Sequence, residues 1–152
     1  MKLKDRLNRV LAGQDFTGQT DRSEVLERYK AAARCYAMTE NAVAVLSDMR
    51  TNTSYIHYGG FARALGLGRG GAQSEVCSIW EEDILRRIHP DDLTAKYLQE
   101  LRFFRFIKRQ PRHRRTDFHL LTPLRMRQTA GGYVKALHRM FYVSASSSDG
   151  LW

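Results

Sequence analysis

Hydrophobic residues recur with a helical period at the start of the chain. Leu3, Leu7, Val10 and Leu11 fall on one side of a helix, and charged residues occupy most positions between them. Gly13 follows at the position of a helix C-cap. This pattern predicts a short amphipathic helix.

A second helical pattern begins near residue 21. Asp21 and Glu24 have the spacing of a capping box, in which two side chains satisfy amides of the first helical turn. The apolar positions that follow predict one buried face, made of Val25, Leu26, Tyr29, Ala32, Ala33 and Tyr36.

From residue 42 the hydrophobic period changes to that of strands. Residues 42–46 and 55–58 lie on either side of a polar turn, which predicts a hairpin. Gly59 and Gly60 end the second strand, and residues 61–65 form one helical turn before a glycine-rich stretch.

Two further helices are expected in the middle of the chain. Ser78 and Glu81 form another capping box, which begins a predicted helix of about ten residues. Pro90 suits the first position of a longer helix, because its missing N–H would have no partner there. The predicted buried stripe of this long helix is Leu93, Tyr97, Leu101, Phe104 and Ile107, with Lys96 and Glu100 on other sides.

The last third of the chain has the pattern of a sheet. Residues 118–128 and 133–143 predict two antiparallel strands joined through a glycine turn. Pro123 cannot donate to a strand ladder and predicts a bulge or an edge position. Residues 144–150 form a further turn, and Leu151-Trp152 begins what resembles another strand.

Composition narrows the class of protein. The length of 152 residues corresponds to one domain, and 43% hydrophobic with 27% charged residues is typical of globular proteins. The longest apolar run, residues 42–46, is far shorter than the roughly 20 residues that cross a bilayer, and the charged N-terminus does not read as a signal peptide. Cys35 and Cys77 lie outside any Cys-x-x-Cys pair, which fits a reduced compartment. We expect no membrane association and a cytoplasmic location.

The net charge of +9 is concentrated in one segment. Residues 105–115, the basic segment, carry six positive charges and no carboxylate, which leaves 9 − 6 = +3 for the rest of the chain. These charges belong to Arg105, Lys108, Arg109, Arg112, Arg114 and Arg115. With Phe104 and Phe106 as stacking groups, the segment is a candidate for nucleic-acid contacts. The alternative is a solvated helix end, where cations suit the negative helix C-terminus and Pro111 stops the helix.

No pattern in the sequence is typical of an enzyme. The glycines between residues 66 and 71 match G-x-G-x-x-G in letters, but they neither follow a buried strand nor open a long helix, which favours a loop. The five histidines lack zinc spacing, and no serine or cysteine has a catalytic setting. The carboxylates of residues 81–83 and 91–92 lie in first helical turns, where the helix dipole explains them. We predict neither catalytic residues nor a metal site.

Several strings resemble the PAS family of sensor domains. Ile88-His89-Pro90-Asp91-Asp92-Leu93 closely resembles the His-Pro-Asp-Asp string that opens the long helix of that family. Residues 42–48 and 53–58 are similar to its first two strands, and residues 61–66 to its short helix ending in Leu-Gly. Leu124-Arg125-Met126-Arg127 resembles one of the paired strands that follow the long helix.

The last strands also resemble one group within this family. Gly131-Gly132 stands at the turn between the paired strands, where Asp-Gly is usual. With His138-Arg139-Met140-Phe141-Tyr142, these strands look similar to the N-terminal halves of bacterial LuxR-type transcription regulators. In that group a helix-turn-helix DNA-binding domain follows the sensor. The resemblance spans residues 40–152.

The resemblance implies an α+β fold, a PAS-like antiparallel sheet of about five strands with helices on one face, in the order ββααα βββ. Residues 1–39 would form an N-terminal helical extension, and residues 40–152 a sensor domain cut within its last strand. The implied function is non-catalytic signal sensing in a bacterial transcription regulator, with DNA bound only by a domain beyond residue 152.

A ligand of such a domain would bind between the sheet and the helices. Strand alternation places the candidate cavity residues, and plain core positions are the alternative. These candidates are Val43, Val45, Tyr58, Phe61, Trp80, Tyr97, Leu121, Met126 and Val134. No cofactor follows from the resemblance, because neither cysteine stands in the reactive string of flavin-binding members and His89 is explained as a helix cap rather than a haem ligand.

The apolar stripes of the N-terminal helices predict a homodimer through Leu3, Leu7, Val25 or Tyr29. Two other functions remain open at this point. One is a nucleic-acid-binding module acting through the basic segment, and the other is a small enzyme or cofactor carrier that uses the glycine-rich stretch.

Overall fold

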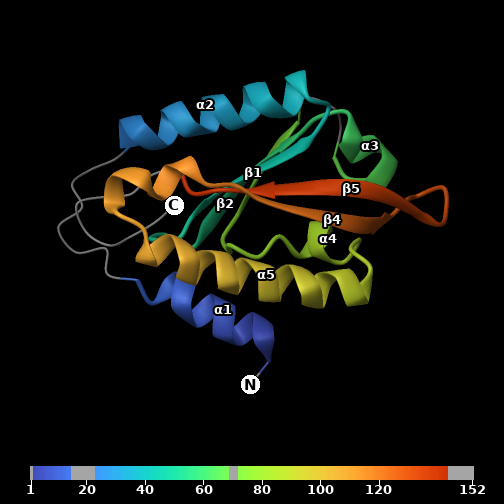
Figure 1. The fold of residues 1–152 in the computed structure, drawn as a ribbon. Coiled ribbons are helices and arrows are strands. Elements are labelled where there is room, and N and C mark those ends of the chain that lie inside the picture. The colour runs from blue at the N-terminus through green and yellow to red at the C-terminus, as the bar shows by residue number, and fades with distance from the viewer. Residues whose placement is uncertain (1, 15–22, 69–71, 144–152) are drawn as a thin grey trace. The chain divides into compact units, whose positions relative to one another are not determined.

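The computed structural model describes residues 2–14, 23–68 and 72–143, and these form an α+β protein with antiparallel strands, as expected (Figure 1). The chain divides into two compact units. The first unit contains residues 1–19, 88–125 and 135–152, and the second contains residues 20–87 and 126–134. The two N-terminal helices therefore belong to different units.

The second unit contains a three-stranded sheet. Strands β1 (Val43–Asp48), β2 (Thr53–Tyr58) and β3 (Gln73–Val76) are antiparallel and lie in the order β1-β2-β3. The β1–β2 hairpin confirms the prediction from the alternating pattern. Strand β3 was not expected, because its sequence is polar and too short to show a period.

Helix α2 (Ser23–Thr39) packs on β1 and β2. Its C-terminal end is fixed to the sheet, because the Ala42 N–H donates to the Ala37 carbonyl and the Gly59 N–H donates to the Ala42 carbonyl. A Cβ on Gly59 would collide with both carbonyl oxygens, so only glycine fits at this junction. The predicted helix is confirmed. Its Asp21 cap lies outside the described residues.

The buried face of α2 differs from the expectation. Ala37 is its most buried residue, at 1% exposed, whereas the expected face residues Ala32 and Tyr36 are exposed. The prediction for those two was wrong, because the hydrogen bond from the Ala42 N–H to the Ala37 carbonyl holds the Ala37 side of the helix on the sheet. The other residues of the expected face, Val25, Leu26, Tyr29 and Ala33, are half-buried. Helix α3 (Phe61–Leu65) follows β2 as predicted, with Gly66 in the left-handed conformation as its C-cap.

The predicted helix of about ten residues after Ser78 is wrong. Only α4 (Glu82–Leu85) forms there. The Ser78 hydroxyl does accept from the Trp80 N–H at 3.0 Å. The Glu81 carboxylate accepts hydrogen bonds from the hydroxyls of Ser47 and Ser54 on the β1–β2 hairpin, at 3.4 and 3.2 Å.

The first unit is built around helix α5 (Pro90–Arg109), against which α1 (Leu3–Ala12) packs. Both helices begin and end close to the predicted residues. Leu7 is fully buried within this unit and Leu11 is 7% exposed. Leu7 therefore cannot serve as an exposed dimer contact as expected, because α5 already covers it.

Helix α5 begins as its sequence predicts. The His89 Nδ1 accepts a hydrogen bond from the Asp91 N–H at 3.2 Å, with Pro90 at the first position. The predicted apolar stripe faces inward. Lys96 and Glu100 were expected outside it, yet both are buried as an ion pair of 2.6 Å. A lysine and a glutamate four residues apart can enter the interior together because each supplies the other's counter-charge.

Strands β4 (Leu120–Arg127) and β5 (Tyr133–Met140) form a two-stranded antiparallel hairpin, as predicted. A 3₁₀ helix, η1 (Arg112–Asp117), joins α5 to β4. Pro123 is exposed, and within the described residues β4 pairs with β5 alone, which fits an edge position. The described strands form one sheet of three and one of two, so the single five-stranded sheet stays a prediction. The strand expected at Leu151-Trp152 lies outside the described residues.

Candidate ligand pocket beneath helix α2

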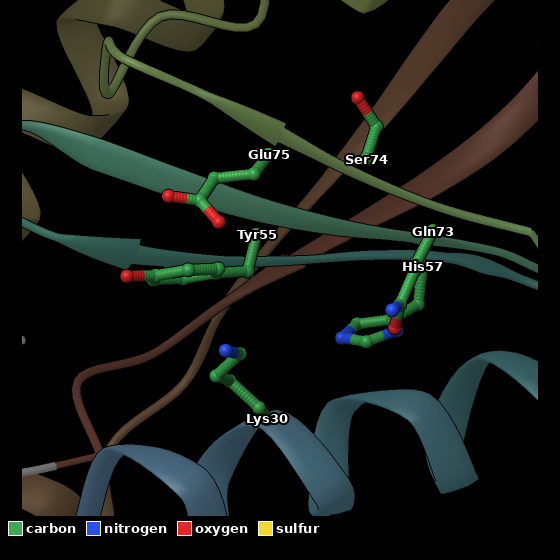
Figure 2. Close-up of a pocket in the computed structure, with 6 residues that line it drawn as sticks. All are labelled: Lys30, Tyr55, His57, Gln73, Ser74 and Glu75. Carbon is green, nitrogen blue, oxygen red and sulfur yellow. The ribbon is translucent and has the colours of Figure 1, made fainter. Parts of the chain in front are cut away.

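A pocket of about 220 Å³ lies between α2 and the β2–β3 strands of the second unit (Figure 2). It combines cationic, anionic, aromatic and amide side chains. Its lining residues are Lys30, Tyr55, His57, Gln73, Ser74 and Glu75. None of these six was identified from the sequence.

Strand geometry brings these side chains together. Tyr55 and His57 are two residues apart on β2 and therefore point to the same face of the sheet. The register pairs Tyr55 with Glu75 and His57 with Gln73 on β3. Ser74 lies between them on the strand and points away from the pocket in Figure 2.

His57 is the least solvated polar group of the pocket. The residue is only 6% exposed, and its Nε2 has no hydrogen-bond partner in the described structure. Burial lowers the pKa of His57, and the positive charges of Arg34 and Lys30 lower the pKa further. The imidazole is therefore neutral at pH 7, with one nitrogen able to donate and one able to accept. A buried nitrogen without a partner is costly, and a ligand group that bonds to it would remove that cost.

Lys30 and Tyr55 form the opposite end of the pocket. The Lys30 ammonium lies 4.4 Å from the centre of the Tyr55 ring and 3.1 Å from the Glu27 carboxylate. Burial raises the pKa of the Tyr55 phenol, and the Glu75 carboxylate raises the pKa further, so the hydroxyl stays protonated and able to donate. The pocket thus presents a cation, a carboxylate, a phenol and a neutral imidazole within one small volume.

This volume limits the ligand to a small polar molecule. Pockets for drug-sized ligands hold roughly 300–1,000 Å³, more than this pocket offers. The position under α2 gives binding a mechanical consequence. Because α2 is fixed to the sheet at Ala37, close to its C-terminal end, an occupant beside Lys30 would bear on the N-terminal half of the helix.

The cavity residues expected from the sequence lie elsewhere. None of the nine is among the residues that line the pocket beneath α2. Seven of them are in the second unit, with Met126 buried there at 5% exposed. Those that are half-buried are Val43, Tyr58, Phe61, Trp80 and Val134.

Two expected cavity residues have exposed side chains, and one lies in the core of the first unit. Val45 is 37% and Leu121 is 52% exposed, so within the described structure neither encloses a cavity. Tyr97, at 8% exposed, lies on α5. Alternation identified the strands correctly, but it does not say which of the two faces is covered.

A signal for the pocket was present in the sequence. Tyr55 and His57, two aromatic residues with polar groups, occupy alternating positions of a strand, and Ser54 and Ile56 point to its other face. Such a strand has a polar-lined face rather than a purely apolar one. The partners on β3 could not be foreseen, because that strand was not recognised.

The basic segment divides into structural and exposed charges. Arg115 is 7% exposed, and its guanidinium donates to the carbonyls of Gln110 and Lys108, each at 3.1 Å. Arg115 therefore caps the C-terminal end of α5 and cannot contact a nucleic acid without breaking that cap. The Lys108 ammonium lies 5.5 Å from the Phe104 ring centre, which draws it toward the protein. The side chains of Arg105, Arg109, Arg112 and Arg114 are exposed.

Within the described residues, no three His, Cys, Asp or Glu side chains converge as metal ligands do. Both cysteines are free and exposed. No described helix combines the length and the apolar character needed to span a bilayer.

No protein-family model matches the chain, and no curated protein shows significant similarity to it.

Proposed function

We propose that this chain is a non-catalytic signal-sensing domain, PAS-like in fold, from a bacterial transcription regulator of the LuxR type. In this proposal a small polar ligand enters the pocket beneath α2 and shifts the population of α2 positions. The output, a helix-turn-helix domain beyond residue 152, responds to that shift. The observation that carries the proposal is His57, whose buried Nε2 has no partner and lies in a pocket with mixed charges.

The order of elements supports the fold part of the proposal. A β-hairpin and short helices precede the long α5, and two antiparallel strands follow it. The His-Pro-Asp-Asp string on which the resemblance rests has a structural role here. Asp92 accepts from the Arg125 side chain at 2.9 and 2.8 Å and from its backbone N–H at 2.8 Å. The string thus fastens the start of α5 to β4, which explains its presence without catalysis.

The mechanism requires only differential binding. A ligand shifts a conformational equilibrium by the difference in its affinity for the two states. With α2 close to the sheet, Lys30 and His57 contact one ligand together, and with that half of α2 displaced they do not. Ligand binding therefore favours the close position of α2.

The test begins with a screen of small amino acids, carboxylic acids and amines by two-dimensional NMR on the isotopically labelled chain. We expect at least one compound to give saturable shifts at β2, β3 and α2, and to slow amide exchange in the N-terminal half of α2. His57→Phe should abolish both effects. His113→Phe changes the same residue type at an exposed position of η1 and should leave both unchanged.

Two results would count against this function. One is the absence of saturable binding to the parent chain by every compound in the screen. The other is binding that leaves amide exchange in α2 unaffected, which would show that the ligand does not change the position of α2.

Nucleic-acid binding is a second candidate function. It is favoured by the exposed guanidinium groups of Arg105 and Arg109, four residues apart on α5, with the Phe106 ring 43% exposed beside them. Neighbouring cations and an aromatic ring are the elements of a surface that follows a phosphate backbone. Such binding would weaken steeply as the salt concentration rises.

A further inference from the structure

The outward face of the β4–β5 hairpin carries unusually exposed apolar side chains. Leu121 is 52%, Leu137 is 62% and Phe141 is 38% exposed. Strand alternation puts these side chains on one side together with the exposed Pro123, Lys135 and Arg139. We call these six residues the hairpin face. All of them belong to the first unit.

The other side of the hairpin is occupied by α5. The Phe103 ring of α5 stacks on Tyr142 just after β5 with ring centres 5.8 Å apart, and the Phe104 ring of α5 meets the same Tyr142 ring edge-on. Buried side chains such as Leu124, at 4% exposed, line this inner side. The outward side has no such cover among the described residues. Contiguous exposed apolar side chains on a folded protein mark an interaction surface.

The charged side chains of the hairpin segment itself have one sign. Residues 118–143 contain four Arg or Lys residues and no Asp or Glu. Arg125 is neutralised by Asp92 from α5, while Lys135 and Arg139 flank Leu137 on the exposed positions of β5. A partner that covers the leucines would therefore meet two cations and gain from carrying carboxylates beside its apolar groups.

A hollow of about 290 Å³ opens beside the hairpin face. It is lined by Asp92, Pro123, Leu124, Arg125 and Lys135. An anchoring side chain of a partner could enter this recess while neighbouring groups cover Leu121 and Leu137. The combination of a recess, exposed leucines and flanking cations is that of a docking surface for an amphipathic segment.

We propose that the hairpin face docks an acidic amphipathic segment of a partner protein, with apolar side chains over Leu121, Leu137 and Phe141 and carboxylates opposite Lys135 and Arg139. A nucleic acid suits this face less, because phosphates would pair with the cations but leave two leucines uncovered. A second copy of the chain also suits it less, because a two-fold contact would place Lys135 and Arg139 near their own copies without a carboxylate. The proposal is independent of the pocket beneath α2.

The experiment uses the full chain and a designed helical peptide with Leu and Phe on one side flanked by Glu. We expect saturable NMR shifts at the hairpin face and an affinity that falls as salt rises. The double variant Leu121→Ser/Leu137→Ser should weaken binding by about tenfold or more. Leu98→Ser, at a residue 36% exposed on α5 and outside the face, is the matched control and should bind like the parent chain.

A charge reversal tests the specificity. Lys135→Glu/Arg139→Glu should lose binding to the acidic peptide and gain binding to the same peptide with Lys in place of Glu. Three outcomes would overturn the proposal: equal binding of the acidic and basic peptides to the parent chain, tighter binding of a single-stranded oligonucleotide to the same residues, or self-association through the face that excludes the peptide.

Discussion

Asp92 has one role within its own helix and a second role that joins it to a residue far away in the sequence. Its position in the first turn of α5 follows from local rules, since carboxylates are favoured at the positive end of a helix. Its hydrogen bonds to Arg125, 33 residues away, depend on the tertiary structure. These bonds lower the pKa of Asp92 from 3.8 to about 2, and those from the Arg125 side chain have the largest effect.

This shift predicts a loss of stability in acid. The carboxylate has a lower pKa in the folded than in the unfolded chain, so it stabilises the fold above about pH 4 and ceases to do so as the pH falls toward 2. Asp92→Asn should lower the melting temperature at pH 6 and have little effect at pH 2. Melting curves at both pH values test this. A variant that loses as much at pH 2 as at pH 6 would show that packing, not charge, accounts for the loss. Asp91→Asn, at an exposed neighbour, is the control.

At the scale of elements, α1 is an integral part of the first unit. Two of its leucines, Leu7 and Leu11, are buried and α1 packs on α5, while Leu3 is only half-buried. An amphipathic stripe on a short helix predicts that some surface covers it, but it does not distinguish a second copy from another part of the same chain. The structure shows that α5 covers Leu7. The homodimer itself stays a prediction, with Leu3, Val25 and Tyr29 as its remaining residues.

The packing of α1 leads to a measurable difference between its leucines. Leu7→Ala should lower the free energy of unfolding by about 2–5 kcal/mol, the usual cost of a leucine-to-alanine change in a core. Leu3→Ala should cost clearly less, because Leu3 keeps partial contact with water. Urea denaturation at two protein concentrations measures both. Equal losses would contradict the different burial of the two leucines, whereas a midpoint that rises with protein concentration would favour the homodimer.

At the scale of the whole molecule, the net charge of +9 does not say which cations a partner can reach. Arg115 caps α5, Lys108 lies over Phe104, and Arg125 pairs with Asp92. Among the exposed cations of the described residues are two groups, one at Arg105, Arg109, Arg112 and Arg114 and one at Lys135 and Arg139 on the hairpin face. The first group suits phosphates, while the second is mixed with leucines.

The four exposed arginines set an upper limit for binding to duplex DNA through the basic segment. With about 0.9 counterion released per phosphate contact, the plot of log affinity against log salt should have a slope no steeper than about −4. Arg105→Gln/Arg109→Gln should reduce that slope by about 2. Arg115→Gln should leave the slope unchanged and lower the melting temperature, because it removes a helix cap. A change of slope in Arg115→Gln would contradict the structural role given to this residue.

The sequence by itself determined the features that depend on neighbouring residues. Helices α1, α2 and α5, the β1–β2 hairpin and the His89 cap follow from periodicity, turn residues and capping groups, all of which act within a few residues along the chain. These rules also identified β4 and β5, since a long alternating pattern on both sides of a glycine turn is typical of a β-hairpin.

The tertiary structure alone decided the partners that are distant in sequence. Glu81 lies just before α4, where Ser47 and Ser54, 34 and 27 residues away along the chain, donate hydrogen bonds to its carboxylate. Lys96 and Glu100 became interior residues because they neutralise each other there. The pocket around His57 needed a third strand whose four residues are too few to show a period. Burial and pairing depend on which surfaces meet, and that is settled by the packing of the whole chain rather than by any local pattern.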